Sequence, residues 1–272
     1  NKKPTMVLLD EVHTYSGISG AQTAMLLRRW KHLASVSPHF VGLSATLADA
    51  RTFFATLIGE QDSRVEEITP HPAELDRVGM EYLVALRGDP ASQSSLLSTS
   101  IQTAMLMRRT LDATNNNTAI DSQVYGSKAF LFTDDLDVTN RMFYNLRDAE
   151  GQNSWGDADL GAHPGGSLAN LRNRLWPEER LRNRFGQYWG LCEWLGHRLE
   201  GAPMLIERTS SQDSGVATNA DIIVATASLE VGFNDPEVNV VLQHKAPRDP
   251  AQFLQRKGRA GRRIEMRPWT IV

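Results

Sequence analysis

Two clusters of charged residues, near opposite ends of the chain, carry residue types suited to phosphate chemistry. Near the start, the apolar run 6–9 stops at Asp10 and Glu11, and Val12 and His13 follow. Near the end, residues 255–262 read Gln-Arg-Lys-Gly-Arg-Ala-Gly-Arg. This order sets Arg259 and Arg262 three residues apart, which on a helix is about one turn. Both guanidinium groups could then reach the same phosphate group.

The carboxylate pair suits hydrolysis of a terminal phosphate. That reaction needs magnesium held against the phosphates, an aligned water molecule and neutralisation of developing negative charge. Asp10 ends the apolar run and is therefore a candidate magnesium ligand that acts through water. Glu11 is then placed to polarise the attacking water. The alternative is that both residues are solvated carboxylates at the end of a strand.

Hydroxyl side chains follow a second apolar run. Residues 40–43 read Phe-Val-Gly-Leu and lead directly into Ser44, Ala45 and Thr46. One interpretation is that these hydroxyls cap the helix that we expect over residues 48–58. For residues 255–262 the corresponding alternative is a basic amphipathic helix without catalytic function.

Taken in this order, the motifs resemble those of superfamily 2 helicases of the DExH type. The Asp-Glu-Val-His quartet at 10–13, Ser-Ala-Thr at 44–46, the segment 225–236 and the arginine motif at 255–262 carry the resemblance. The surroundings of the first motif are similar to the Lhr-type and Ski2-like branch. The resemblance implies RecA-like domains that use ATP and Mg²⁺. It also implies a nucleic-acid partner, DNA or RNA, that is single-stranded or has a single-stranded tail.

The resemblance also assigns a role to each matching residue. Gly258 would let the backbone approach a neighbouring surface closely, and Asn234 stands where the family commonly has aspartate. Residues 208–210 would replace a His-Gly-Ser segment of that branch. The implied sets are catalytic Glu11, Gln255, Arg259 and Arg262; nucleotide-binding or coupling Asp10, His13, Ser44, Thr46, Gly232, Asn234, Asp235 and Gly258; magnesium-binding Asp10; and nucleic-acid-binding Thr226, Arg208, Thr209 and Ser210.

The sequence contains no phosphate-binding loop of the form G-x-x-x-x-G-K-[ST]. Such motors bind the nucleotide phosphates through this loop, upstream of the carboxylate strand. We therefore expect the first half of the first RecA-like domain, with its catalytic lysine, to lie outside this chain. The chain alone should hydrolyse little ATP.

Apolar runs that alternate with helical patterns predict an α/β fold with parallel sheets flanked by helices. We expect the carboxyl-terminal part of a first RecA-like domain at 1–60 and a linker with a helical insertion at 61–127. A second RecA-like domain is expected at 128–272, with an insertion at 151–202 that includes an amphipathic helix over 181–199. Asp135 is the expected N-cap of a helix that follows the strand 129–132.

Composition sets limits on the class of protein. The 272 residues carry a formal charge of −3, so any nucleic-acid binding depends on local placement of cations. A single cysteine, Cys192, and the lack of a long apolar run predict a cytoplasmic protein without membrane contact. Two other classes stay open: a nucleic-acid-binding or scaffold module with a degenerate motor, and a P-loop ATPase that remodels protein complexes.

Overall fold

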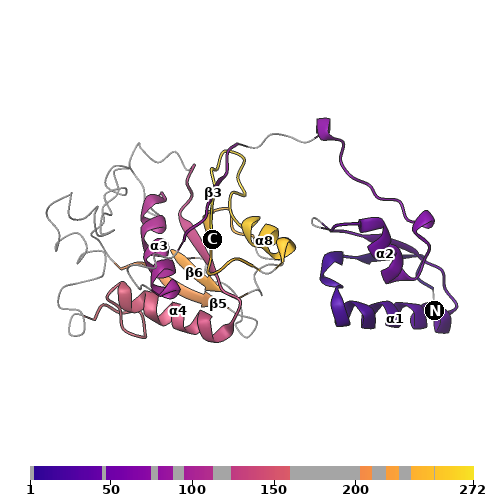
Figure 1. The fold of residues 1–272 in the computed structure, drawn as a ribbon, viewed down its shortest axis with the longest axis horizontal. Coiled ribbons are helices and arrows are strands. Elements are labelled where there is room, and N and C mark those ends of the chain that lie inside the picture. The colour runs from indigo at the N-terminus through magenta and orange to yellow at the C-terminus, as the bar shows by residue number, and fades with distance from the viewer. Residues whose placement is uncertain are drawn as a thin grey trace. The chain divides into compact units, whose positions relative to one another are not determined.

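The computed structural model describes residues 3–44, 47–74, 79–87, 95–112, 124–159, 203–209, 219–226, 234–247 and 249–272. The chain divides into two compact units, Asn1–Arg77 and Val78–Val272, each of which is described here by itself (Figure 1). Both units combine parallel strands with helices, as the sequence predicts. Among the described residues, no helix is long and apolar enough to cross a membrane.

The first unit contains a two-stranded parallel sheet with two helices. Strand β1 (Met6–Leu9) pairs with β2 (His39–Gly42), and Met6 lies opposite His39. Helix α1 (Gly17–Ala34) connects the two strands, and α2 (Ala50–Ile58) follows the second. Short 3-10 turns η2 (Asp62–Arg64) and η3 (Pro72–Glu74) continue the chain. The strands confirm the predicted runs to within two residues at each end.

Cationic side chains of α1 donate hydrogen bonds to the last carbonyl groups of α2. The last carbonyl groups of a helix lack partners within the helix and favour nearby cations. Arg28 Nη2 donates to Thr56 O at 2.7 Å, and Lys31 Nζ donates to Ile58 O at 2.7 Å. These bonds hold the two helices together more specifically than the small apolar core could, which centres on Val12, Ala24 and Leu57.

Helix α1 leaves several of its apolar side chains exposed. Ala24 is buried and Leu27 is partly buried, but Met25 and Leu33 are 62% and 79% exposed. The reason is geometric, because two four-residue strands and one short helix cannot surround an eighteen-residue helix.

The second unit contains a six-stranded sheet in the order β3-β8-β7-β4-β6-β5, in which every pairing is parallel. Its strands are β3 (Tyr82–Val84), β4 (Lys128–Phe132), β5 (Ile206–Thr209), β6 (Ile222–Ala225), β7 (Val238–Gln243) and β8 (Trp269–Ile271). This sheet with flanking helices confirms the predicted α/β class. Strand β5 begins at Ile206, the last residue of the apolar run Met204-Leu205-Ile206.

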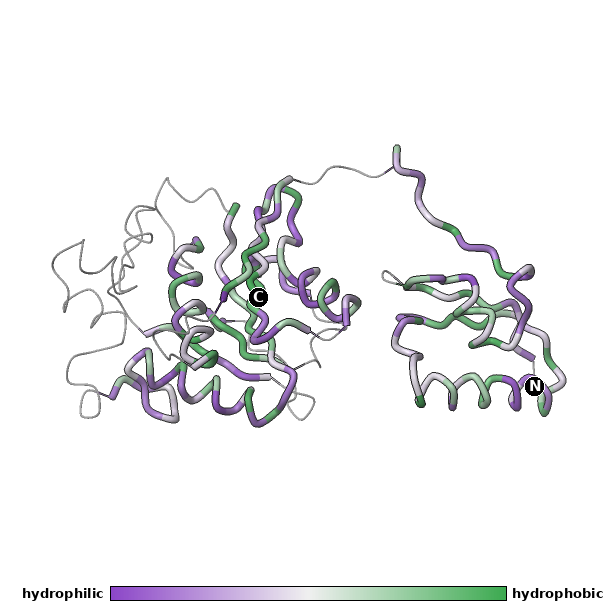
Figure 2. The backbone as a smooth tube through the Cα atoms, in the orientation of Figure 1, coloured by the Kyte–Doolittle hydropathy of each residue, from purple (hydrophilic) through white to green (hydrophobic). Residues whose placement is uncertain are grey.

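The central strands of this sheet are buried on both faces, and Figure 2 shows their apolar character. On one face, Ala129 and Leu131 pack with residues of α3 (Leu96–Thr110) and α4 (Leu136–Ala149). On the other face, Phe130 and Phe132 belong to a second cluster, which includes Ala260 beyond α8 (Pro250–Lys257). A strand covered on both faces reads as a continuous apolar run, which is why these strands were recognisable in the sequence.

Two elements within the segment 61–127 belong to the second unit. Strand β3 pairs with β8, and the rings of Tyr82 and Trp269 stack with centroids 4.3 Å apart. Helix α3 contributes Ile101 and Met105 to the core of the sheet. The structural boundary at residues 77–78 thus precedes the boundary at 127 that the sequence led us to expect.

Helix starts follow the expected capping chemistry. The Asp135 carboxylate accepts the Asp137 N–H at 2.7 Å, which confirms it as the N-cap of α4. Ser95 and Asp249 cap α3 and α8 in the same way. The predicted helix over 181–199 lies outside the described residues, as do Cys192 and most of the insertion 151–202.

A buried ion pair joins α3 to the end of α4. Arg109 donates from Nη1 and Nη2 to the two carboxylate oxygens of Glu150 at 2.7 and 2.8 Å, and the Glu150 side chain is 0% exposed. Arg109→Met should lower the free energy of unfolding by about 3 to 5 kcal/mol, because it leaves a buried carboxylate without its cation. Urea denaturation monitored by circular dichroism measures this loss.

The matched control is Arg141→Met, which breaks the exposed Arg141–Asp137 pair. We expect it to cost less than about 1 kcal/mol. Equal and small losses for both variants would contradict the structural importance of the Arg109–Glu150 pair.

Candidate functional site

The acidic tip of the first unit comprises residues 10–13 together with Ser44. Strand β1 ends at Leu9, whose carbonyl accepts the Leu43 N–H at 2.9 Å. The Leu43 carbonyl in turn accepts the Val12 N–H at 2.9 Å. Because the strands are parallel, both segments leave the sheet at the same edge. The first and second motifs, about thirty residues apart in sequence, thus become neighbours.

A side-chain hydrogen bond joins these two motifs. His13 Nδ1 lies 3.0 Å from Ser44 Oγ and 3.5 Å from Glu11 Oε2. The His13 side chain is only 9% exposed, whereas that of Glu11 is 37% exposed. The His13 side chain is therefore packed within the tip, whereas that of Glu11 is accessible to solvent. This contact also argues against a capping role for Ser44, because the N-cap of α2 is Asp49. Thr46 lies outside the described residues.

The backbone of Glu11 adopts an unusual conformation. Its φ of 48° lies in the left-handed region, which costs a residue with a side chain about 1 to 2 kcal/mol. Its N–H donates to Asp10 Oδ1 at 2.9 Å, and the 3-10 turn η1 (Val12–Thr14) begins at the next residue. Strain of this kind gathers where surrounding contacts fix a functional geometry.

The acidic tip has the donor set that magnesium accepts. Magnesium usually keeps several waters and uses one or two carboxylates together with substrate phosphates. Asp10 and Glu11 supply two adjacent carboxylates at a strand end. The described residues hold no cluster of three or more metal-ligating side chains. The tip could thus hold magnesium as a nucleotide complex but not in a cage made by the protein alone.

The arginine motif differs in form from the sequence expectation. Helix α8 ends at Lys257, so Arg259 and Arg262 lie in the segment that follows, and the premise of one helical turn is wrong. We name residues 258–268, which connect α8 to β8, the arginine loop. Gly258 is the C-cap of α8. Arg259 is partly buried and Arg262 is exposed.

Gly261 gives the arginine loop its turn. Its φ is +68°, and a Cβ at this position would lie 2.5 Å from Pro268 Cγ. Its N–H donates to the Val238 carbonyl at 3.0 Å, which ties the loop to the start of β7. Only glycine satisfies the torsion and the close contact together. The need for glycine at 261 is therefore local to this unit.

Arg256 anchors α8, a role that sequence analysis missed. The side chain is 0% exposed, and Nη2 donates to Asp134 Oδ1 at 2.6 Å. Its guanidinium carbon lies 5.6 Å from the centre of the Phe132 ring. Asp134 lies two residues after the end of β4, so the pair fastens the helix near the carboxyl end of a central strand. The adjacent Gln255 on α8 is partly buried.

The expected role of Asp235 is not supported by its position. Its Oδ2 lies 2.6 Å from Lys128 Nζ, and its Oδ1 accepts the Glu237 N–H at 2.9 Å. Lys128 begins β4, so this buried pair lies at the amino end of the sheet. Thr226 follows β6 at the opposite, carboxyl end. Asn234 is exposed, and Gly232 lies outside the described residues.

The two expected nucleic-acid contacts on β5, Arg208 and Thr209, are engaged or buried within the unit. Arg208 Nη1 donates to Asn140 Oδ1 of α4 at 2.5 Å, and its guanidinium carbon lies 5.5 Å from the Phe143 ring centre. Thr209 is only 3% exposed. Neither side chain therefore presents a free surface, because β5 packs closely against α4. Ser210 lies outside the described residues.

A buried histidine at the carboxyl end of β7 also escaped sequence analysis. His244 Nδ1 lies 2.8 Å from Ser100 Oγ of α3, and the residue is 6% exposed. Burial lowers the pKa of His244, and the nearby Lys245 and Arg141 lower this pKa further against the opposing effect of Asp134. The imidazole is therefore held neutral at neutral pH. Because its partner is 144 residues away, no sequence signal could have revealed it.

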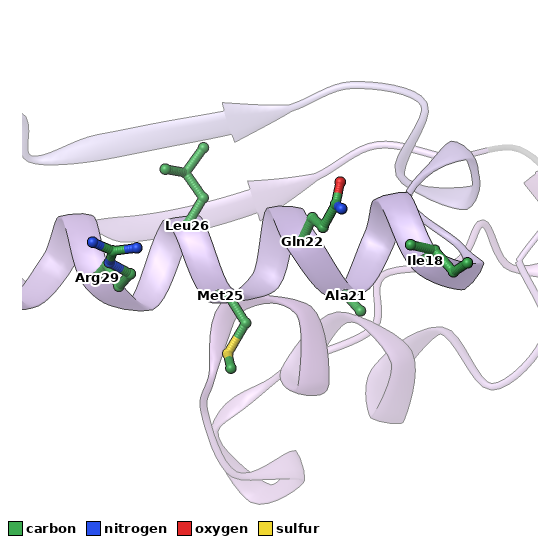
Figure 3. A pocket seen from close by; sticks show the side chains of 6 residues that line it. All are labelled: Ile18, Ala21, Gln22, Met25, Leu26 and Arg29. Atoms are coloured by element: carbon green, nitrogen blue, oxygen red, sulfur yellow. The ribbon is translucent and has the colours of Figure 1, made fainter.

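A surface hollow in the first unit lies away from the acidic tip. It has a volume of about 490 Å³ and runs along α1 (Figure 3). Ile18, Met25, Leu26 and Arg29 are among its lining residues. The lining includes none of the residues expected to act on a nucleotide. It consists mainly of the exposed apolar side chains of α1 and suits packing rather than catalysis.

Comparison with known proteins agrees with these motifs. Residues 195–263 match the family described as helicase conserved C-terminal domain. Two curated relatives are 24% identical over 262 residues: the Lhr helicase/probable uracil glycosylase of Mycolicibacterium smegmatis and the Lhr helicase/uracil glycosylase of Escherichia coli. Each alignment covers 95% of this chain but 16% of the relative. The chain thus spans about one sixth of the length of these relatives.

Solved helicase structures share the fold. The Mycobacterium smegmatis helicase Lhr, bound to single-stranded DNA and AMP-PNP, matches with a TM-score of 0.57 and 18% identity over 98% of this chain and 28% of that chain. Saccharomyces cerevisiae Dbp5, bound to RNA and ADP BeF3, matches with a TM-score of 0.52 and 15% identity over 98% of this chain and 52% of that one. The chain is thus similar in sequence to two Lhr helicases over 262 residues, carries a match to the helicase conserved C-terminal domain and shares its fold with solved helicases.

Proposed function

We propose that the full-length gene product is an ATP-dependent helicase or translocase that couples ATP hydrolysis to movement along DNA or RNA. The hydrogen bond between His13 and Ser44 carries this proposal, because it joins an acidic tip to a second motif at one edge of a parallel sheet. The Lhr relatives are named helicases, and the solved Lhr holds single-stranded DNA with a nucleotide analogue. Both facts support the same assignment.

The acidic tip is the proposed hydrolytic centre and makes this a DExH-type motor. Glu11, the more exposed of the two contacting side chains, accepts a proton from the attacking water. Asp10 would hold magnesium through water, and the ion would neutralise charge on the phosphates. His13 contacts both Glu11 and Ser44, so a movement of the Glu11 side chain would also move Ser44. Nucleotide state could thereby be coupled to the loop that follows β2.

The arginine loop is proposed to supply the cations. Arg259 and Arg262 neutralise the charge that develops on the transferring phosphoryl group. Their loop is fixed at one end by the buried Arg256–Asp134 pair and in its middle by the Gly261–Val238 hydrogen bond. Such preorganisation is what electrostatic catalysis requires, since donors that are already in place need no reorganisation during the reaction.

The proposed nucleic-acid contact lies at the carboxyl end of the second sheet. Thr226 is the candidate for a phosphate contact, because it follows β6 at that edge and is partly exposed. Asn234 is exposed and stays a candidate for coupling. Arg208 and Thr209 are weaker candidates than the sequence suggested, since both are engaged within the unit.

The first test is the stimulation of ATPase activity by nucleic acid. The full-length gene product should hydrolyse ATP faster with DNA or RNA homopolymers, and the preferred polymer identifies the track. The 272-residue chain alone, which lacks a phosphate-binding loop, should show little turnover. ATP hydrolysis that ignores both polymers would favour a protein-remodelling ATPase. No hydrolysis at all would favour a scaffold with a degenerate motor.

A second prediction concerns the water-activating group. Glu11→Gln in the full-length gene product should leave ATP binding within about threefold but lower kcat by about 10² to 10⁴, because the amide cannot accept a proton. Fluorescent-nucleotide titration and a phosphate-release assay separate the two effects. Retained turnover would reject Glu11 as the general base.

A third prediction concerns the arginine loop. Arg259→Ala should lower kcat by about 10³ to 10⁵, which corresponds to roughly 4 to 7 kcal/mol of transition-state stabilisation. Arg262→Ala should act in the same direction. Arg263→Ala is the control, because Arg263 pairs with Glu237 at 3.3 Å in a partly exposed contact. If all three variants lose activity equally, a general effect on the loop rather than a catalytic role explains the result.

A further inference from the structure

The segment that enters the second unit runs beside the arginine loop. Gly79 has a φ of +71°, and a Cβ built on it would lie 3.5 Å from the Met266 carbonyl. Tyr82 N–H donates to the Pro268 carbonyl at 2.9 Å, just before β3 and β8 begin to pair. Residues 79–82 therefore line the arginine loop along its final part.

One carboxylate in this segment contacts both sides of the arginine loop. Glu81 Oε2 lies 2.6 Å from Lys257 Nζ, and Glu81 Oε1 accepts the Thr270 hydroxyl at 3.3 Å. Lys257 is the last residue of α8 and precedes Arg259 by two positions. Thr270 lies in β8, just after the loop. Glu81 thus spans the two points at which the loop begins and ends.

The packing around this contact is open. A pocket of about 210 Å³ lies between the entering segment and the loop, lined by Met80, Glu81, Lys257, Gly258, Ala260, Gly261, Arg263, Met266 and Pro268. Ile264, within the loop, is 76% exposed. Ala260 and Met266 anchor the loop in the core, whereas its exposed remainder depends on polar contacts for its position. The side chains of the Glu81–Lys257 pair are about one-third exposed, so the pair adds little to the free energy of unfolding. Its effect is to orient the arginine loop.

We propose that Glu81 is a positioning residue that holds the arginine loop and so sets the placement of Arg259 for ATP hydrolysis. This inference rests on the proposed function. Glu81 lies near the start of the second unit and contacts Lys257, which precedes Arg259 by two residues. A misplacement of about 1 Å at such a group can cost on the order of 10²-fold in rate.

The test uses the full-length gene product with a nucleic-acid activator. Glu81→Gln should lower kcat by about tenfold or more, with KM for ATP within about threefold and an unchanged melting temperature. The exchange Glu81→Lys with Lys257→Glu should restore most of kcat, because it recreates the ion pair with reversed polarity. Glu265→Gln is the control, since Glu265 is an exposed carboxylate on the same loop. It should retain full kcat.

A second measurement does not depend on turnover. Hydrogen–deuterium exchange should be faster across residues 258–268 in Glu81→Gln than in the unchanged protein, with exchange in β7 unaffected. Unchanged exchange in the loop, unchanged kcat, or failure of the charge exchange to restore kcat would each overturn the proposal. If the unchanged protein hydrolyses no ATP, the proposed function fails, whereas the exchange measurement still decides whether Glu81 positions the loop.

Discussion

The geometry of parallel strands governs where this chain can do chemistry. Carboxyl ends of parallel strands meet at one edge, and strands covered on both faces are built mainly from apolar residues. In the first unit this rule brings Glu11 and Ser44 together at the ends of β1 and β2. In the second it places Asp134, Thr226 and His244 after three neighbouring strands. Functional groups are therefore displaced into the segments that follow the strands.

Polar contacts fix those segments where apolar packing cannot. Arg256 reaches from α8 to Asp134, and Lys128 reaches from β4 to Asp235 at the other end of the sheet. Each pair has a buried or nearly buried cation, so the loss of one partner would be far costlier than the loss of a surface pair. Specific ion pairs thus determine which loop geometry accompanies a sheet that many sequences could form.

The sequence predicted those parts of the fold that rest on local chemistry. Asp135 could be recognised as an N-cap because its carboxylate accepts a hydrogen bond from a residue only two positions away. Phe130 and Phe132 belong to a continuous apolar run, which is typical of a strand that is covered on both faces. Strand β3 could not be recognised, because three residues carry little pattern and its partner β8 is far along the chain. Strand β3 joins the sheet only through its tertiary contact with β8.

The candidate site follows the same division. The spacing of Asp10, Glu11 and His13 was informative because the tip is built within four residues of one strand end. The ion pair between Asp235 and Lys128 at the amino end of the sheet could not be predicted, because the two residues are 107 positions apart. Arg256 was overlooked for a similar reason, since its partner Asp134 is 122 residues away. Motif spacing identifies the residues whose side chains suit the chemistry. Long-range ion pairs then determine which of these side chains are occupied in structural contacts.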